Sequence, residues 1–206
     1  MPARTPPDES RRNQKVRASI VEAARELVLD EGYAKLTMKG IAARAGVGKQ
    51  TVYRWWSSPG AVVFEAFLGL DAETDGSTSL PDTGNLDRDL RAVVRATVEE
   101  LRDPRFDAVF RVLAAEIQVD AKLAEAFTSI LLRPQMQATV TRLESARRAG
   151  QVRRGIDLGI AADLLFGPIL RRWLLRTGPL DRAFADAIVT MTLRGLRPSE
   201  PRRRVR

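Results

Sequence analysis

The sequence contains neither cysteine nor histidine. The chain therefore has no disulfide, no thiol nucleophile, no Cys/His zinc site and no imidazole for acid–base catalysis. The remaining reactive residue types show no catalytic spacing, no glycine-rich phosphate loop and no metal cluster. We expect no enzyme activity, no cofactor and no metal site, with a metal held by carboxylates alone as the open alternative.

Long apolar runs are also missing. No stretch of 18 apolar residues is present, and the N-terminus, MPARTPPDESRRNQ, has no apolar segment of the kind that a secretory signal needs. We therefore expect a cytoplasmic protein with no membrane contact. The 206 residues are 44% hydrophobic and 29% charged, which is typical of a globular chain of one or two domains.

Positive charge is concentrated at the two ends of the chain. The net charge is +8, and residues 1–60 hold 11 basic and 6 acidic side chains, whereas residues 197–206 hold 5 and 1. The middle of the chain is nearly neutral. A basic end on a neutral body indicates contact with a polyanion, although a general excess of arginine is the alternative explanation.

The spacing of apolar residues is helical throughout, and no alternating strand pattern occurs. We predict an all-α fold, with a helix from Val16 to about Gly32, a loop over 74–85, and later helices over 86–101, 104–119, 121–149 (kinked at Pro134), 158–176 and 182–196. The predicted domains are a disordered arm (1–14), a helix-turn-helix DNA-binding domain (15–60), a helical ligand-binding and dimerisation body (61–196), and a disordered basic tail (197–206).

Two short helices are predicted between residues 37 and 56. Thr37 is placed to cap the first helix, Gly46 ends it, and Gly48 can cap a second helix from Lys49 to Trp56. Two short helices joined by a glycine-containing turn make a helix-turn-helix. Ser58 and Pro59 then predict the start of a further helix.

The second short helix, from Lys49 to Trp56 within the stretch VGKQTVYRWW, has two different faces. Val52 and Trp56 lie on one face, four residues apart, and anchor the helix. The other face carries lysine, glutamine, tyrosine and arginine, which suit the phosphates and base edges of a major groove. Trp55 then faces the DNA backbone. The alternative is that both tryptophans belong to the core and that the charges are only solvated.

The stretch LTMKGIAARAGVGKQTVYRWW, preceded by LVLDEGYAK, resembles the N-terminal domain of the TetR family of transcriptional regulators. A second stretch, DLLFGPILRRWLLRTGPLDRAFADAIV, resembles the C-terminal domain of one TetR subgroup. The resemblance implies an all-α homodimer that binds a double-stranded DNA operator and answers a small-molecule effector.

Carried over to this chain, the family pattern implies DNA contacts from the recognition segment. The N-terminal basic residues Arg11, Arg12, Lys15 and Arg17 are added as candidates for further contacts, with a solvated, partly disordered arm as the alternative. The implied DNA-binding residues are Thr37, Gly48, Lys49, Gln50, Tyr53, Arg54 and Trp55. Two departures weaken the match: Pro59 replaces a usual lysine, with Gly60 in place of a common glutamate, and Gly48 replaces a common serine.

The body supplies apolar residues that belong either to the core or to an effector cavity. The candidates for the cavity are Phe67, Phe106, Phe110, Leu113, Phe127, Leu131, Phe166 and Trp173, with Arg111, Glu116, Gln118 and Arg171 as polar anchors. The last two helices form the expected dimer seam through Leu164, Ile169, Phe184, Ile188 and Met191, unless this stripe is buried within one subunit.

Three functions compete on this evidence. A repressor that binds a near-palindromic operator as a homodimer, and that a mainly apolar ligand releases, is the leading hypothesis. A DNA-binding protein of low specificity, aided by the basic tail, is the second. An enzyme or a small-molecule carrier is the third and the least supported by the residues.

Overall fold

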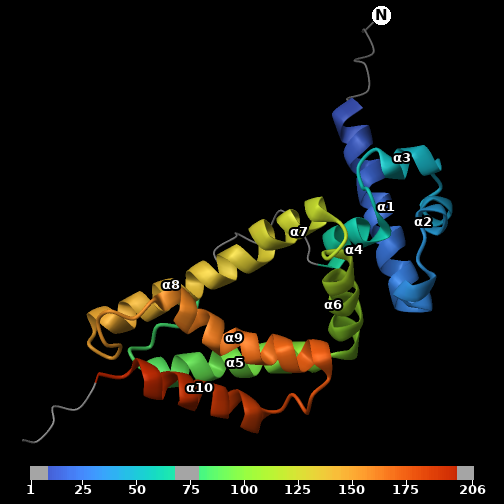
Figure 1. The fold of residues 1–206 in the computed structure, drawn as a ribbon. Helices are drawn as coiled ribbons and strands as arrows, with labels where there is room; N and C mark the ends of the chain where they lie inside the picture. The colour runs from blue at the N-terminus through green and yellow to red at the C-terminus, as the bar shows by residue number, and fades with distance from the viewer. Residues whose placement is uncertain (1–8, 68–78, 199–206) are drawn as a thin grey trace, which may run out of the picture. The chain divides into compact units, whose positions relative to one another are not determined.

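The computed structural model describes residues 9–67 and 79–198, and every regular element in these ranges is helical (Figure 1). The predicted all-α class is confirmed. The chain divides into two compact units: residues 1–75 with 108–127, and residues 76–107 with 128–206. Residues 108–127, which the sequence assigned to the body, therefore pack with the N-terminal helices.

The first unit is built around the long helix α1 (Glu9–Glu31), which packs against α2 and α4. Its other elements are the 3-10 turn η1 (Tyr33–Lys35), α2 (Met38–Arg44), α3 (Lys49–Tyr53), α4 (Pro59–Phe67), the last part of α6 (Pro104–Glu116) and α7 (Ala121–Phe127). The core contains Ile20, Ile41, Val52 and Val63, whose side chains are fully buried. Burial of each such side chain contributes about 1.5–3 kcal/mol relative to exposure.

The second unit is a helical bundle. It contains α5 (Leu86–Arg102), the π-helical turn η2 (Thr128–Leu132), α8 (Arg133–Arg148), α9 (Leu158–Leu175) and α10 (Arg182–Leu196). Helix α5 packs against α9 and α10, and α8 packs against α9. Leu90, Leu143, Leu165 and Val189 meet in its core.

The predicted helix caps are formed. The Ser58 hydroxyl accepts a hydrogen bond from the Ala61 N–H at 3.2 Å, and the Asp181 carboxylate accepts one from the Phe184 N–H at 2.8 Å. Asp157 caps α9 through the N–H groups of the residues two and three positions later. These side chains satisfy N–H groups that have no partner within their helices.

Several predicted boundaries differ from the structure. Residues 9–14 form the first turns of α1 rather than a disordered arm, while residues 1–8 and 199–206 lie outside the described residues. The predicted helix over 121–149 is helical from residue 121 to residue 148, as α7, η2 and α8 follow one another without a non-helical residue between them. The irregularity is the π-helical turn η2, which ends two residues before Pro134, and Pro134 stands in the first turn of α8.

Two further helices end earlier than predicted. Helix α3 ends at Tyr53, three residues before the predicted end at Trp56, although the Trp56 N–H still donates to the Val52 carbonyl at 3.1 Å. Helix α6 ends at Glu116 rather than at Val119. The cause is Asp120, whose carboxylate caps α7 through the N–H groups of Lys122 and Leu123.

Buried polar contacts fix the segment that precedes α5. Arg142 of α8 donates to the Asp89 carboxylate at 2.8 Å, and both side chains are almost fully buried. Arg142 also donates to the Pro81 carbonyl at 3.1 Å, and Thr83 donates to Asp89. Among the described helices, none combines the length and hydropathy that a membrane span requires.

Candidate nucleic-acid interface

The start of α2 is set by Thr37. Its hydroxyl oxygen accepts a hydrogen bond from the Gly40 N–H at 3.0 Å, which confirms the predicted cap. Gly46 follows α2 with φ +67°, a conformation that side chains with a Cβ rarely adopt. Gly48 then occupies the N-cap position of α3. Helices α2 and α3 pack on each other as a helix-turn-helix.

Helix α3 and the turn after it are anchored by Val52 and Trp56. The Val52 side chain is fully buried and Trp56 is 5% exposed, as the sequence predicted for this face. The Trp56 indole N–H donates to the Glu65 carboxylate at 2.9 Å, and Arg17 donates to the same oxygen at 2.8 Å. These contacts tie the end of the helix-turn-helix to α1 and α4.

The opposite face of this segment is polar, cationic and exposed. Lys49, Gln50, Tyr53 and Arg54 are all exposed, and Tyr53 keeps 49% of its surface. The Lys49 ammonium lies 5.3 Å from the centre of the Tyr53 ring, and the Arg54 guanidinium lies 4.6 Å from the Trp55 ring. The two cation–π contacts hold the charged groups on this face without neutralising them.

The remaining predicted DNA-binding residues lie on the surface of the same unit. Thr37, Gly48, Lys15 and Arg17 are exposed, and Trp55 is half-buried. Trp55 packs edge-on against Trp56 with ring centres 5.7 Å apart. Arg17 also pairs with Glu65, so it supports the fold of the head whether or not it meets a phosphate.

Sequence reasoning missed the acidic residues that hold the head together. Glu65 is the one charged residue in α4, PGAVVFEAF. A single charged residue in an apolar helix was the sequence feature that could have indicated its structural role. Glu116, predicted as a polar anchor for a ligand, accepts a hydrogen bond from the Tyr33 hydroxyl at 3.0 Å. Burial of Tyr33 and its contact with Glu116 raise the pKa of the phenol above its ordinary value.

The predicted effector residues fall in both units. Phe67, Phe110, Leu113 and Phe127 lie in the first unit, where the Phe110 and Phe127 rings meet at 5.6 Å. Phe106, Leu131, Phe166 and Trp173 belong to the second unit. Leu113, Phe127 and Trp173 are buried in the cores of these units. The other five are half-buried.

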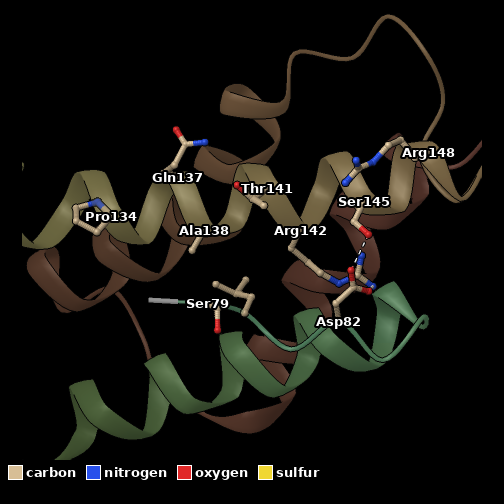
Figure 2. A pocket seen from close by; sticks show the side chains of 10 residues that line it. Ser79, Asp82, Pro134, Gln137, Ala138, Thr141, Arg142, Ser145 and Arg148 are labelled. Carbon is tan, nitrogen blue, oxygen red and sulfur yellow. Dashed lines mark hydrogen bonds and ion pairs between the residues drawn. The ribbon is translucent and has the colours of Figure 1, made fainter. Parts of the chain in front are cut away.

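One cavity of about 380 Å³ lies in the second unit, and the predicted effector residues do not line it. Figure 2 shows Asp82, Arg142 and Ser145 meeting near one end of this cavity, with Pro134 at the other end. The Ser145 hydroxyl donates to Asp82 at 2.6 Å, and the Arg142 guanidinium is already bound to Asp89. The Asp82, Arg142 and Ser145 side chains are therefore already engaged in hydrogen bonds.

A second cavity, of about 370 Å³, lies on the outer face of α9 and α10. Its lining is almost entirely apolar and consists of Leu164, Pro168, Phe184, Ala187, Ile188, Met191 and Thr192. Leu164 is 55% exposed and Met191 is 69% exposed. Four of the five predicted dimer residues line this face, whereas Ile169 is fully buried in the core of its own subunit.

Comparison with known proteins decides the family. Residues 20–66 match the model for bacterial regulatory proteins of the tetR family, and residues 80–192 match the tetracyclin repressor-like C-terminal domain. The chain belongs to the TetR family. This TetR-family chain is thus a DNA-binding transcriptional regulator, and the resemblance noted in both stretches of its sequence is confirmed.

Two curated proteins are similar to this TetR-family regulator over most of their length. The uncharacterized HTH-type transcriptional regulator YdeS of Bacillus subtilis is 30% identical over 90% of this chain and 91% of its own. The DNA-binding transcriptional repressor TetR of Mycobacteroides abscessus is 26% identical over 84% of this chain and 88% of its own.

Solved structures share the fold. The TetR family transcription regulator SCO0332 is 34% identical, with a TM-score of 0.67 over 89% of this chain and 100% of that one. SmeT, solved as a complex with triclosan, is 27% identical, with a TM-score of 0.59 over 90% and 93% of the two chains.

Proposed function

We propose that this TetR-family protein is a repressor that binds a near-palindromic operator as a homodimer and is released by a small, mainly apolar ligand. The observation that carries the DNA-binding part is the division of the α3 segment into a buried and an exposed face. Val52 and Trp56 are buried, whereas Lys49, Gln50 and Tyr53 are exposed. Such a face fits a major groove, where lysine meets guanine or phosphate and glutamine meets adenine.

The apolar face of α9 and α10 supports the homodimer. Leu164 and Met191 are exposed large hydrophobic side chains that line the same groove as Phe184 and Ile188. An isologous contact across a two-fold axis buries this face against its own copy. Two recognition helices then meet two half-sites, about one helical turn of DNA apart or somewhat more, and the operator is correspondingly near-palindromic.

The comparisons support the repressor and ligand parts. One relative is named as a repressor, and SmeT was solved with a bound small molecule. A ligand acts on such a protein only by binding one conformation more tightly than another. The half-buried phenylalanines predicted for the effector site remain candidates for its walls.

A genomic-fragment selection with the purified protein at about 150 mM salt tests this proposal. Bound fragments are sequenced and retested by fluorescence anisotropy against random DNA. We expect a shared palindrome bound at least about 10³-fold more tightly than random DNA. The operator then serves to screen compounds for release. An absence of any enriched motif, with affinity collapsing as salt rises, would favour the low-specificity alternative.

A further inference from the structure

Glu116, the last residue of α6, contacts two separate parts of the DNA-binding head. Its carboxylate accepts the hydrogen bond from the Tyr33 hydroxyl at 3.0 Å. Its aliphatic stem lies against the backbone of Gly60, in the first turn of α4. Tyr33, Gly60 and Glu116 belong to the same compact unit, so these contacts lie within one unit of the molecule.

The two contacts flank the helix-turn-helix in the sequence. Tyr33 lies four residues before Thr37, which starts α2, and Gly60 lies four residues after Trp56, which closes the segment. A single side chain therefore meets the chain where it enters the helix-turn-helix and where it leaves. Fixing both ends restricts how α2 and α3 sit on α1 and α4.

Gly60 is buried, and no larger residue fits beside Glu116. A Cβ atom added at Gly60 would lie 2.7 Å from Cγ of Glu116 and 3.1 Å from its Cβ. A methyl group there must shift the Glu116 stem, and this shift moves the carboxylate that accepts the hydrogen bond from the Tyr33 hydroxyl. Gly60 stands where the family commonly has a glutamate. Because Gly60 has no side chain, the Glu116 side chain of α6 has room to pack against it.

A neighbouring contact reinforces the same junction. The Ser57 hydroxyl donates to the Asp120 carboxylate at 2.8 Å. Hydrogen bonds from the Leu123 N–H and from Ser57 hold the pKa of Asp120 below its ordinary value. Phe64 of α4 packs on Phe127 of α7 with ring centres 6.0 Å apart. Residues 116–127 therefore contact the head at successive points along α4 and the turn before it.

We propose that Glu116 is a positioning residue for DNA recognition, which sets the placement of the helix-turn-helix through Tyr33 and through its close approach to Gly60. It acts without touching DNA. This inference rests on the DNA binding of the proposed function. It adds one specific side chain, Glu116 at the end of α6, to the residues on which the affinity of the head depends.

A double-mutant cycle on the full-length chain tests this role. The variants are Gly60→Ala, Glu116→Ala and the pair together, measured by anisotropy on the selected operator and on a random duplex of the same length. We expect Gly60→Ala to weaken DNA binding about tenfold when Glu116 is present and to have little effect in the Glu116→Ala background, because coupled neighbours are not additive. The slope of affinity against salt should stay unchanged, since no phosphate contact is lost.

Conservative and matched variants separate positioning from general stability. Glu116→Gln keeps the stem and an acceptor for Tyr33, so its affinity should stay close to that of the wild type. Gly195→Ala is the control for the added methyl group, because nothing lies within 4 Å of a Cβ at that helical position. Thermal unfolding of every variant is recorded beside its DNA affinity.

The outcomes are distinct. The positioning role is supported if the effect of Gly60→Ala on DNA affinity depends on Glu116 and if Glu116→Gln binds DNA like the wild type. The role is overturned if the two substitutions are coupled only in their effect on the unfolding temperature. It is also overturned if Gly60→Ala changes DNA affinity equally in the wild type and in the Glu116→Ala variant. Failure of the wild type to prefer any operator would refute the specific repressor, while the cycle on the random duplex would still report on Glu116.

Discussion

Asp89 of α5 and Arg142 of α8 form an ion pair that is almost completely buried, with an N–O distance of 2.8 Å. Thr83 and the Pro81 carbonyl complete the hydrogen bonds of the two charged groups. Buried charges of this kind are tolerated only when they are paired and fully hydrogen-bonded. The pair therefore links the segment before α5 to α8. Removing either charged group leaves the other one buried without a partner of opposite charge.

Asp89→Asn should destabilise the protein by about 3–5 kcal/mol, because it leaves the Arg142 charge buried and uncompensated. Urea unfolding at a fixed protein concentration measures the change in the free energy of unfolding. Asp82→Asn is the matched control, since that carboxylate also lies near Arg142 but is 47% exposed. Equal stability losses for the two variants would contradict the importance of the buried pair.

The same pair predicts a pH dependence. Burial alone would raise the pKa of Asp89, but hydrogen bonds from Thr83 and Arg142 outweigh it and hold the pKa below its ordinary value. A depressed pKa in the folded state gives stability that is present above the unfolded pKa, about 3.9, and is lost as the pH falls through the folded value. The stability difference between the wild type and Asp89→Asn should therefore shrink as the pH drops below about 4.

A charge on the apolar face of α9 and α10 should separate the proposed dimer. Met191→Glu or Leu164→Glu replaces an exposed apolar side chain by a carboxylate. Because both positions are exposed in the single subunit, its fold tolerates the change. Sedimentation equilibrium should give half the mass, and operator affinity should fall by at least about 100-fold, because two linked sites become one. Val119→Glu, at an 84% exposed position in the other unit, should leave the mass unchanged. A dimer that survives both substitutions would place the seam elsewhere.

The local features of the fold were predictable from the sequence, because caps and apolar spacing act over a few residues. Thr37, Ser58, Asp157 and Asp181 all begin helices where their side chains predicted. The burial of Val52 beside exposed Lys49 followed from helical periodicity in the same way.

The contacts between distant segments were not predictable. Glu65 meets Trp56 and Arg17, and Glu116 meets Tyr33 across 83 positions of the chain. A charged residue in an apolar stretch signals a buried partner but does not say which one. The sequence therefore predicted the exposed polar face of α3 but not the acidic side chains that hold this segment in place.

Thr37→Val should destabilise the first unit by about 1 kcal/mol, because it removes the acceptor for the Gly40 N–H at the start of α2. Thr37→Ser keeps that hydroxyl and should stay near the wild type in thermal unfolding. If Thr37 also meets a phosphate, the valine variant loses affinity equally for operator and for random DNA. A valine variant as stable as the wild type would show that the cap contributes nothing.

Substitutions on the exposed face of α3 should separate base reading from backbone contact. Lys49→Ala and Gln50→Ala should change sequence preference at defined operator positions, by about 1–3 kcal/mol for each lost base contact. Tyr53→Phe keeps the ring that lies 5.3 Å from Lys49, so it removes only the hydroxyl. It should weaken all DNA alike and leave the salt slope unchanged, whereas the loss of a lysine–phosphate contact would lower that slope by about 0.9. Anisotropy on the operator, on single-base variants of it and on random DNA measures these effects. An equal loss on all duplexes for all three variants would remove the specific-reader model, because no side chain on this face would then distinguish one base pair from another.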